Sequence, residues 1–108
     1  MIPPLAAVLA AAVLAAGGHN IQVNCTNWTP PELQGVPWRG WAYTGEPRIF
    51  LRPYVCRAAH RGERRALFTL SHEVAHAKGI TGEPAADRYA YRVLPRVMTA
   101  VRRLWAQR

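Results

Sequence analysis

The chain has 108 residues, of which 50% are hydrophobic and 19% are charged, and its formal net charge is +8 at pH 7. This length leaves room for one small domain, and so small a core benefits from a covalent or metal staple. The positive charge comes from scattered arginines without a recognisable nucleic-acid-binding motif. We therefore expect a solvated basic surface and no specific nucleic-acid partner.

Residues 5–16 are almost entirely Ala, Leu and Val, and Gly17 and Gly18 follow them. An apolar stretch of this length that ends in small residues is typical of a signal peptide, and it is short for a membrane-spanning helix, which needs about 20 residues. We expect residues 1–18 to be a signal peptide or an N-terminal anchor that gives some membrane association, and residues 19–108 to be one domain. The chain would then be exported by a bacterium, as a secreted or cell-envelope protein. The alternative is an alanine-rich helix buried in the domain.

The next feature along the chain is a pair of cysteines, Cys25 and Cys56. In an exported protein an even count predicts one disulfide, which would close a loop of about 30 residues and contribute on the order of 3 kcal/mol. In a cytosolic protein the same residues would be two buried free thiols. No C-x-x-C pair is present, so we do not expect a cysteine-based zinc site.

Residues 19–47 are rich in Pro, Gly and Trp, which predicts an ordered loop region whose tryptophans cover the core. Short strands are predicted at 22–25 and at 48–52. Pro47 and Pro53 bound the second strand, and prolines at both ends suit the edge of a sheet. An edge strand offers unpaired backbone groups to an extended peptide substrate. A purely structural strand that covers the following helix is an equal alternative.

The segment His72-Glu73-Val74-Ala75-His76 matches the pattern H-E-x-x-H. Positions i and i+4 of a helix lie on the same face, so both imidazoles can bind one zinc ion. The carboxylate of Glu73 then lies near the water that the zinc would bind and can take its proton. The motif therefore predicts a zinc site with a general base beside it.

The residues around the motif predict that it lies on a helix. Apolar residues recur at steps of three and four, which is the spacing of one buried helix face. The members of this face are Leu67, Leu70, Val74 and Ala77. Gly79 stands where a glycine commonly ends a helix, so we expect the motif helix to stop just before it.

A catalytic zinc usually has three protein ligands and one open position. Glu83 is the first carboxylate after the motif, and Asp87, the only aspartate in the chain, stands four residues later. If Pro84 lies in the first turn of a second helix, Glu83 and Asp87 share one face of it. Glu83 could then bind zinc while Asp87 accepts a hydrogen bond from a ligand histidine. Asp87 and His60 are the alternatives for the third ligand.

The combination of HExxH with a later ExxxD resembles the gluzincin zinc peptidases, especially their very small members, the minigluzincins. The segment from Glu83 to Ala90 is similar to the E-x-x-x-(D/N)-x-(F/Y)-A stretch of small bacterial and phage-type metallopeptidases. The resemblance covers about residues 47–95. It implies a zincin-like fold and hydrolysis of peptide bonds.

The resemblance also implies roles for single residues. His72, His76 and Glu83 would bind zinc, Glu73 would be the general base, and Asp87 would orient a histidine. Most gluzincins have many more residues between the second histidine and the glutamate, whereas here six intervene. That gap is nearer to the metzincin arrangement, in which a glycine turns the chain and brings back the third ligand.

Residues 84–94 are predicted to form a second helix, which Pro95 kinks or breaks. Residues 96–107 continue as an amphipathic helix whose apolar stripe packs on the core or, as a minor alternative, binds an anionic membrane. The predicted fold class is α+β. It is a small zincin-like domain in which a short sheet, with its edge strand near 48–52, packs on the HExxH helix and precedes a C-terminal helical segment.

These expectations converge on a zinc-dependent metallopeptidase that acts on a peptide or protein substrate. A second electrophile for the tetrahedral intermediate would come from one of four side chains, which are Tyr54, His60, Tyr89 and Tyr91. One alternative is a non-catalytic domain that zinc only stabilises, although such a site needs no carboxylate at position 73. Another is a basic protein that binds nucleic acid or a membrane surface and carries the motif by accident.

Overall fold

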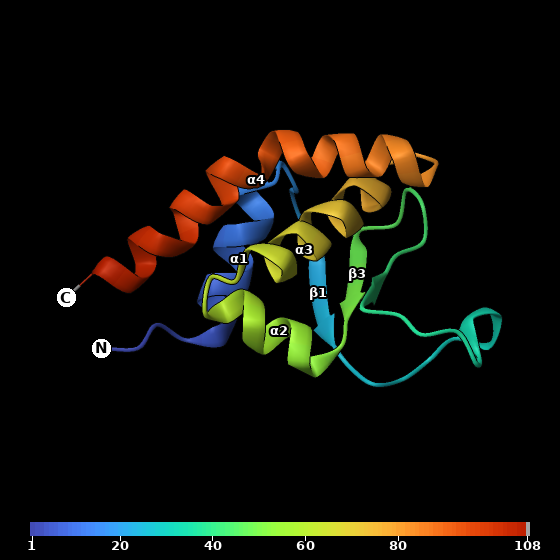
Figure 1. Ribbon diagram of the computed structural model, residues 1–108, viewed down its shortest axis with the longest axis horizontal. Helices are drawn as coiled ribbons and strands as arrows, with labels where there is room; N and C mark the ends of the chain where they lie inside the picture. The colour runs from blue at the N-terminus through green and yellow to red at the C-terminus, as the bar shows by residue number, and fades with distance from the viewer. Residues whose placement is uncertain (108) are drawn as a thin grey trace.

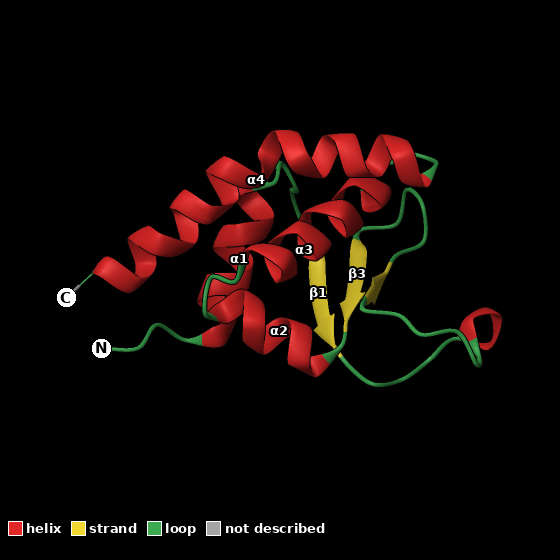
Figure 2. Cartoon of the chain, in the orientation of Figure 1, coloured by secondary structure: helices red, strands yellow, loops and turns green. Residues whose placement is uncertain are grey.

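The computed structural model describes residues 1–107, which form four α-helices and a three-stranded sheet (Figure 1). The elements in chain order are α1 (Leu5–Ala15), β1 (Gln22–Cys25), a 3₁₀ helix (Pro31–Leu33), β2 (Gly40–Trp41), β3 (Arg48–Leu51), α2 (Pro53–His60), α3 (Arg64–Ala77) and α4 (Glu83–Ala106). Helices dominate, and the strands lie together on one side of α3 (Figure 2). The predicted α+β class is confirmed.

The sheet has the order β1-β3-β2, in which β3 pairs in parallel with β1 and antiparallel with β2. The prediction that residues 48–52 form an edge strand is therefore wrong, because β3 is the central strand. Pro47 and Pro53 lie outside β3 and remove no ladder donor from it. The carbonyl of Pro47 even accepts a hydrogen bond of 2.9 Å from the backbone N–H of Gln22. Flanking prolines limit the length of this strand, but not the number of its neighbours.

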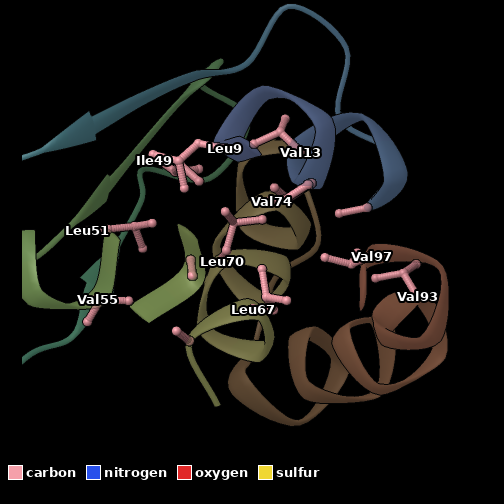
Figure 3. Packing of buried hydrophobic residues seen from close by; sticks show 14 of the residues in the cluster. Leu9, Val13, Ile49, Leu51, Val55, Leu67, Leu70, Val74, Val93 and Val97 are labelled. Atoms are coloured by element: carbon pink, nitrogen blue, oxygen red, sulfur yellow. The ribbon is translucent and has the colours of Figure 1, made fainter. Parts of the chain in front are cut away.

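Helix α3 is the centre of the hydrophobic core. Its predicted apolar face is buried, with Leu67, Leu70 and Val74 having no exposed surface. Figure 3 shows these side chains between Leu51 on the side of the sheet and Val97 of α4. A helix buried on both sides is held in place at each turn, so residues on its remaining face are positioned firmly.

Helix α1 packs against α2, α3 and α4 and belongs to the same core. Its buried residues are Val8, Leu9, Ala12 and Val13. This is the arrangement of an alanine-rich helix buried in the domain, and a boundary after residue 18 would separate these side chains from the rest of the core. Cleavage of a leader at that position stays a prediction. None of the helices within residues 1–107 combines the length and the apolar character that a membrane crossing requires.

Polar contacts also fix both ends of α1. The ring of His60 donates a hydrogen bond of 2.7 Å from Nε2 to the carbonyl of Pro3. At the other end, the hydroxyl of Tyr89 donates to the carbonyl of Ala16, and Lys78 Nζ donates to the next carbonyl at 2.7 Å. Three side chains from three other segments therefore hold α1 in position.

The predicted disulfide between Cys25 and Cys56 is confirmed. It joins the end of β1 to α2 and spans 31 residues of sequence, so it closes the irregular segment that carries β2. Disulfides persist in oxidising compartments, which fits an extracellular environment.

Helix α4 continues through Pro95 without a break, although it bends along its length (Figure 1). A proline inside a helix removes the hydrogen bond to the carbonyl four residues earlier, here that of Tyr91. Both residues are exposed, so water can satisfy that carbonyl. Meanwhile Val93, Val97 and Val101 stay buried against the core on the opposite face. Of the two expected effects of Pro95, a kink or a break, packing therefore excludes the break and keeps the helix continuous.

Candidate metal centre

Helix α3 presents its two motif histidines side by side at its C-terminal end. His72 and His76 are each 9% exposed, and their Nε2 atoms are 3.1 Å apart. The spacing of four residues aligns the rings on one helix face, as expected. Burial of α3 against the sheet and α4 leaves both rings little freedom to turn.

A helix-terminating turn orients the second histidine. The backbone N–H of Gly79 donates to His76 O and that of Ile80 donates to Ala75 O, in a Schellman motif that requires the positive φ of 104° at Gly79. The turn brings the carbonyl of Ile80 to 2.9 Å from His76 Nδ1. The glycine predicted to end the helix therefore also fixes the ring of the histidine three residues before it.

The first turn of α4 supplies the carboxylates. Glu83 Oε1 lies 3.0 Å from His76 Nε2, and Glu83 Oε2 lies 2.9 Å from His72 Nε2. One turn later, Asp87 Oδ1 lies 2.7 Å from His72 Nδ1. Pro84 stands in the first turn of this helix, as predicted, and fits there because that position has no intrahelical N–H bond to lose.

Hydrogen bonds at Nδ1 decide what the two Nε2 atoms can do. Each Nδ1 faces an oxygen acceptor, the carboxylate of Asp87 for His72 and the carbonyl of Ile80 for His76. A neutral imidazole therefore carries its hydrogen on Nδ1 and turns a lone pair outward at Nε2. Two such lone pairs and the Glu83 carboxylate converge within 3.1 Å. A cation at its centre would stabilise this group of acceptors, so the group can hold a metal ion.

The two alternatives for the third ligand lie elsewhere. Asp87 contacts the outer nitrogen of His72 and not the side that faces the cluster. His60 lies against Trp105, with ring centroids 5.1 Å apart, and donates to the N-terminal segment. The structure therefore brings Glu83 to the two histidines and gives the other two candidates different partners.

Glu73 borders the cluster and is 6% exposed. Burial, with a smaller contribution from the negative charge of Glu83, raises the pKa of Glu73 to about 8. Gly40 of β2 lies directly beside it, since a Cβ at that position would be 3.0 Å from Glu73 Cγ and 2.8 Å from a methyl group of Leu51. The absence of a side chain at position 40 therefore makes room for the glutamate between the sheet and α3.

Two hollows flank the cluster, and His72 and Glu73 line both of them. The first, here called the basic hollow, measures about 660 Å³ and is also lined by Arg39, Tyr54, Arg65, Phe68, Thr69 and Asp87. The second, here called the apolar hollow, measures about 620 Å³ and is also lined by Leu33, Val36, Trp41, Ala42, His76 and Glu83. A ligand at the cluster would therefore have space on both sides of it.

The tryptophans partly follow the expectation that they cover a core. Trp38 and Trp41 are buried, and the ring of Trp41 stacks on Phe50 with centroids 3.9 Å apart. Trp28 is 57% exposed, but its ring lies 5.9 Å from that of Trp41. The rings of Trp38 and Trp41 therefore line the apolar hollow.

Among the four side chains considered as a second electrophile, only Tyr54 lines either hollow. Tyr89 donates its hydroxyl to α1, Tyr91 packs on Phe68 with ring centroids 4.7 Å apart, and His60 holds the N-terminal segment. Sequence patterns gave no reason to select Arg39, Arg65 or Gly40. Arg39 and Gly40 lie in the segment predicted to be an irregular loop, and Arg65 lies in the basic stretch that precedes the motif.

Comparison of the chain with protein-family models, with curated proteins and with solved structures finds no match in any of the three.

Proposed function

We propose that the protein is a zinc-dependent peptidase. The observation that carries the proposal is the convergence of His72, His76 and Glu83, whose ligand atoms lie 2.9–3.1 Å apart, with a further carboxylate, Glu73, beside the cluster. A purely structural metal site needs no extra buried carboxylate next to its ligands. The charge of Glu73 is costly at this depth in the protein, which favours a chemical role for it.

The ligand set suits zinc. Two imidazole nitrogens and one carboxylate are a common catalytic zinc set, with one coordination position left open. Ligand atoms about 2.0–2.1 Å from a tetrahedral zinc are separated by about 3.3 Å from one another, close to the distances in this cluster. When bound, zinc would supply a Lewis acid that polarises a substrate carbonyl and lowers the pKa of a coordinated water.

The chain's own residues have separate tasks in the proposed reaction. Glu73 takes a proton from the attacking water and passes it to the leaving amine. Asp87 and the carbonyl of Ile80 hold the two histidine rings with Nε2 toward the cluster. The basic and apolar hollows receive the chain on either side of the scissile bond. The phenol of Tyr54 is the candidate for a hydrogen bond to the oxyanion.

The sequence resemblance supports the same proposal. HExxH on α3 and ExxxD at the start of α4 resemble the pattern of the small gluzincins, and the short turn between the two helices brings Glu83 to the histidines. The disulfide further supports a protein that acts outside the reducing cytosol. We therefore propose an exported or envelope-associated enzyme with a peptide or protein substrate.

The decisive experiment compares the full chain with Glu73→Gln and with Glu46→Gln as a matched control. Glu46 is a half-exposed carboxylate that pairs with Arg48 and lines neither hollow. Native mass spectrometry is expected to find one zinc ion in all three proteins. Cleavage of a peptide library is expected to fall by at least about 100-fold in Glu73→Gln only. Zinc without any hydrolysis in the unsubstituted protein would indicate a structural site, and equal hydrolysis in Glu73→Gln would refute the proposed base.

A further inference from the structure

The basic hollow contains positive charge that no other part of the described chain neutralises. Arg39 and Arg65 line it beside His72 and Glu73. The guanidinium of Arg39 donates from Nε to the hydroxyl of Thr69 at 3.3 Å and lies 5.6 Å from the ring of Tyr54. Neither arginine forms an ion pair within residues 1–107. Both retain free N–H donors toward the hollow.

Among the residues that the structure describes, no carboxylate forms an ion pair with Arg39 or Arg65, although Glu73 and Asp87 line the same hollow. Glu46 pairs with Arg48, and Glu63 pairs with Arg61. Glu32 accepts a hydrogen bond of 2.8 Å from a tyrosine hydroxyl. The other three acidic residues, Glu73, Glu83 and Asp87, stand at the metal cluster. Arg39 and Arg65 are therefore available to bind a carboxylate of another molecule.

The positive charge extends away from the cluster as a groove. A neighbouring hollow of about 360 Å³ shares Arg39, Tyr54 and Arg65 with the basic hollow and adds Arg57, which also has no ion pair within the described chain. The groove thus starts at His72 and runs toward α2 between three guanidinium groups. Glu73 and Asp87 border the groove near His72, where Asp87 is engaged with His72, and Glu63 borders the neighbouring hollow, where it pairs with Arg61.

The other side of the cluster differs in having, within the described residues, no basic side chain apart from the histidines, although Glu73 and Glu83 also line it. Leu33, Val36, Trp41 and Ala42 line the apolar hollow, which contains no arginine or lysine. The two hollows follow each other along β2, since Arg39 precedes this strand and Ala42 follows it. A chain lying across the cluster beside β2 would pass from an apolar to a cationic surface.

From this asymmetry we propose that the site selects acidic peptides, with apolar residues on the Ala42 side of the cluster and carboxylates on the Arg39 side. Arginine binds carboxylates through paired, charge-assisted hydrogen bonds, and Arg39 and Arg65 are the specificity-determining residues. The inference rests on the proposed peptidase function for its substrate class. The binding of carboxylates by the groove can be measured without any hydrolysis.

The test uses the full chain carrying Glu73→Gln, loaded with zinc, and labelled octapeptides whose first half is apolar. The second half contains two glutamates in one peptide and two glutamines in its counterpart, each made with a free or an amidated C-terminus. Fluorescence anisotropy is expected to give about tenfold tighter binding of the glutamate peptide. Higher salt should reduce the difference, since exposed charges are screened. The two C-termini distinguish a side-chain carboxylate from a terminal one.

Matched arginine variants then locate the effect. Arg39→Gln with Arg65→Gln is expected to abolish the preference for glutamate. Arg96→Gln with Arg103→Gln removes the same net charge from a hollow between α1 and α4 and should retain it. Arg65→Glu should shift the preference toward a lysine peptide, which a misfolded variant would not do. Position 65 lies in the first turn of α3, where a negative side chain is favourable.

The outcomes separate this inference from the proposed function. Equal affinity for the glutamate and glutamine peptides, a preference that survives loss of both groove arginines, or no peptide binding at all would overturn the inference. If the unsubstituted enzyme cleaves peptides without regard to acidic residues, the peptidase proposal stands and the groove proposal fails. If it cleaves none but binding depends on Arg39 and Arg65, the groove proposal stands and the peptidase proposal fails.

Discussion

Two leucines of α1 provide a matched test of whether this helix is part of the folded domain. Leu9 is 4% exposed and packs in the core, whereas Leu14 is 59% exposed on the same helix. Substitution by alanine removes the same atoms at both positions and changes helix propensity equally. A difference in stability between Leu9→Ala and Leu14→Ala therefore reports tertiary packing alone.

The expected difference is large for a domain of this size. Truncation of a buried leucine costs about 2–5 kcal/mol, because the lost burial and the cavity add together, whereas exposed positions change stability by about 0.5 kcal/mol or less. Each kcal/mol shifts the midpoint of a domain near 100 residues by about 4 °C or more. Leu9→Ala should thus lower Tm by roughly 10–20 °C, and Leu14→Ala by about 2 °C or less.

The measurement is thermal and urea unfolding of the full chain, with the disulfide intact, followed by circular dichroism. Equal midpoints for the two variants would show that α1 does not pack on the domain. The burial of this helix in the structure would then be wrong, and a dispensable leader would be the better account of residues 1–18. A large effect of Leu9→Ala alone predicts that deletion of residues 1–18 prevents stable folding.

Three further predictions concern the metal centre and the disulfide. Asp87→Asn should weaken zinc binding about 10- to 100-fold in a competitive chelator titration, because it loosens the ring of His72, and an unchanged affinity would contradict the orienting role. Reduction of the bond between Cys25 and Cys56, which spans 31 residues, should cost about 3.5 kcal/mol in urea unfolding, and a change below about 1 kcal/mol would contradict this. In metal-free protein the raised pKa of Glu73 keeps its carboxyl protonated up to about pH 8 in the folded state, whereas the unfolded chain ionises near 4.5. The contribution of protonated Glu73 to the free energy of unfolding is thus fully present below about pH 4.5 and is lost as the pH rises toward 8. Relative to Glu73→Gln, the unsubstituted metal-free protein should therefore lose a few kcal/mol between pH 5 and 8, and parallel pH profiles would count against the buried carboxylate.

Local sequence rules were sufficient for the elements that carry the candidate site. The periodic face with Leu67, Leu70 and Val74 predicted α3, and Gly79 predicted its end, because both signals depend on residues within a few positions. The spacing of His72 and His76 needed only helix geometry. For the carboxylate, Pro84 marked the start of the next helix, which limited the distance that the intervening turn could span.

Patterns with more than one tertiary solution could not be resolved in this way. The apolar residues 5–16 favoured a leader or an anchor over a buried helix, because their composition has no polar face that identifies a partner surface. The prolines around β3 fit an edge strand, but the pairing with β1 comes from residues more than 20 positions earlier in the chain. Apolar packing between distant segments decided the first case, and strand pairing decided the second.

The sequence by itself determined the mixed α+β class, the motif helix with its stop, the disulfide and the residues able to bind a metal. These properties depend on short-range geometry or on the chemistry of single side chains. Only the tertiary structure decided that Glu83 meets both histidines, that β3 is central, and that Arg39 and Arg65 form one cationic groove beside the cluster. Such contacts join residues that lie apart in sequence, and their positions depend on how the helices and the sheet pack on one common core.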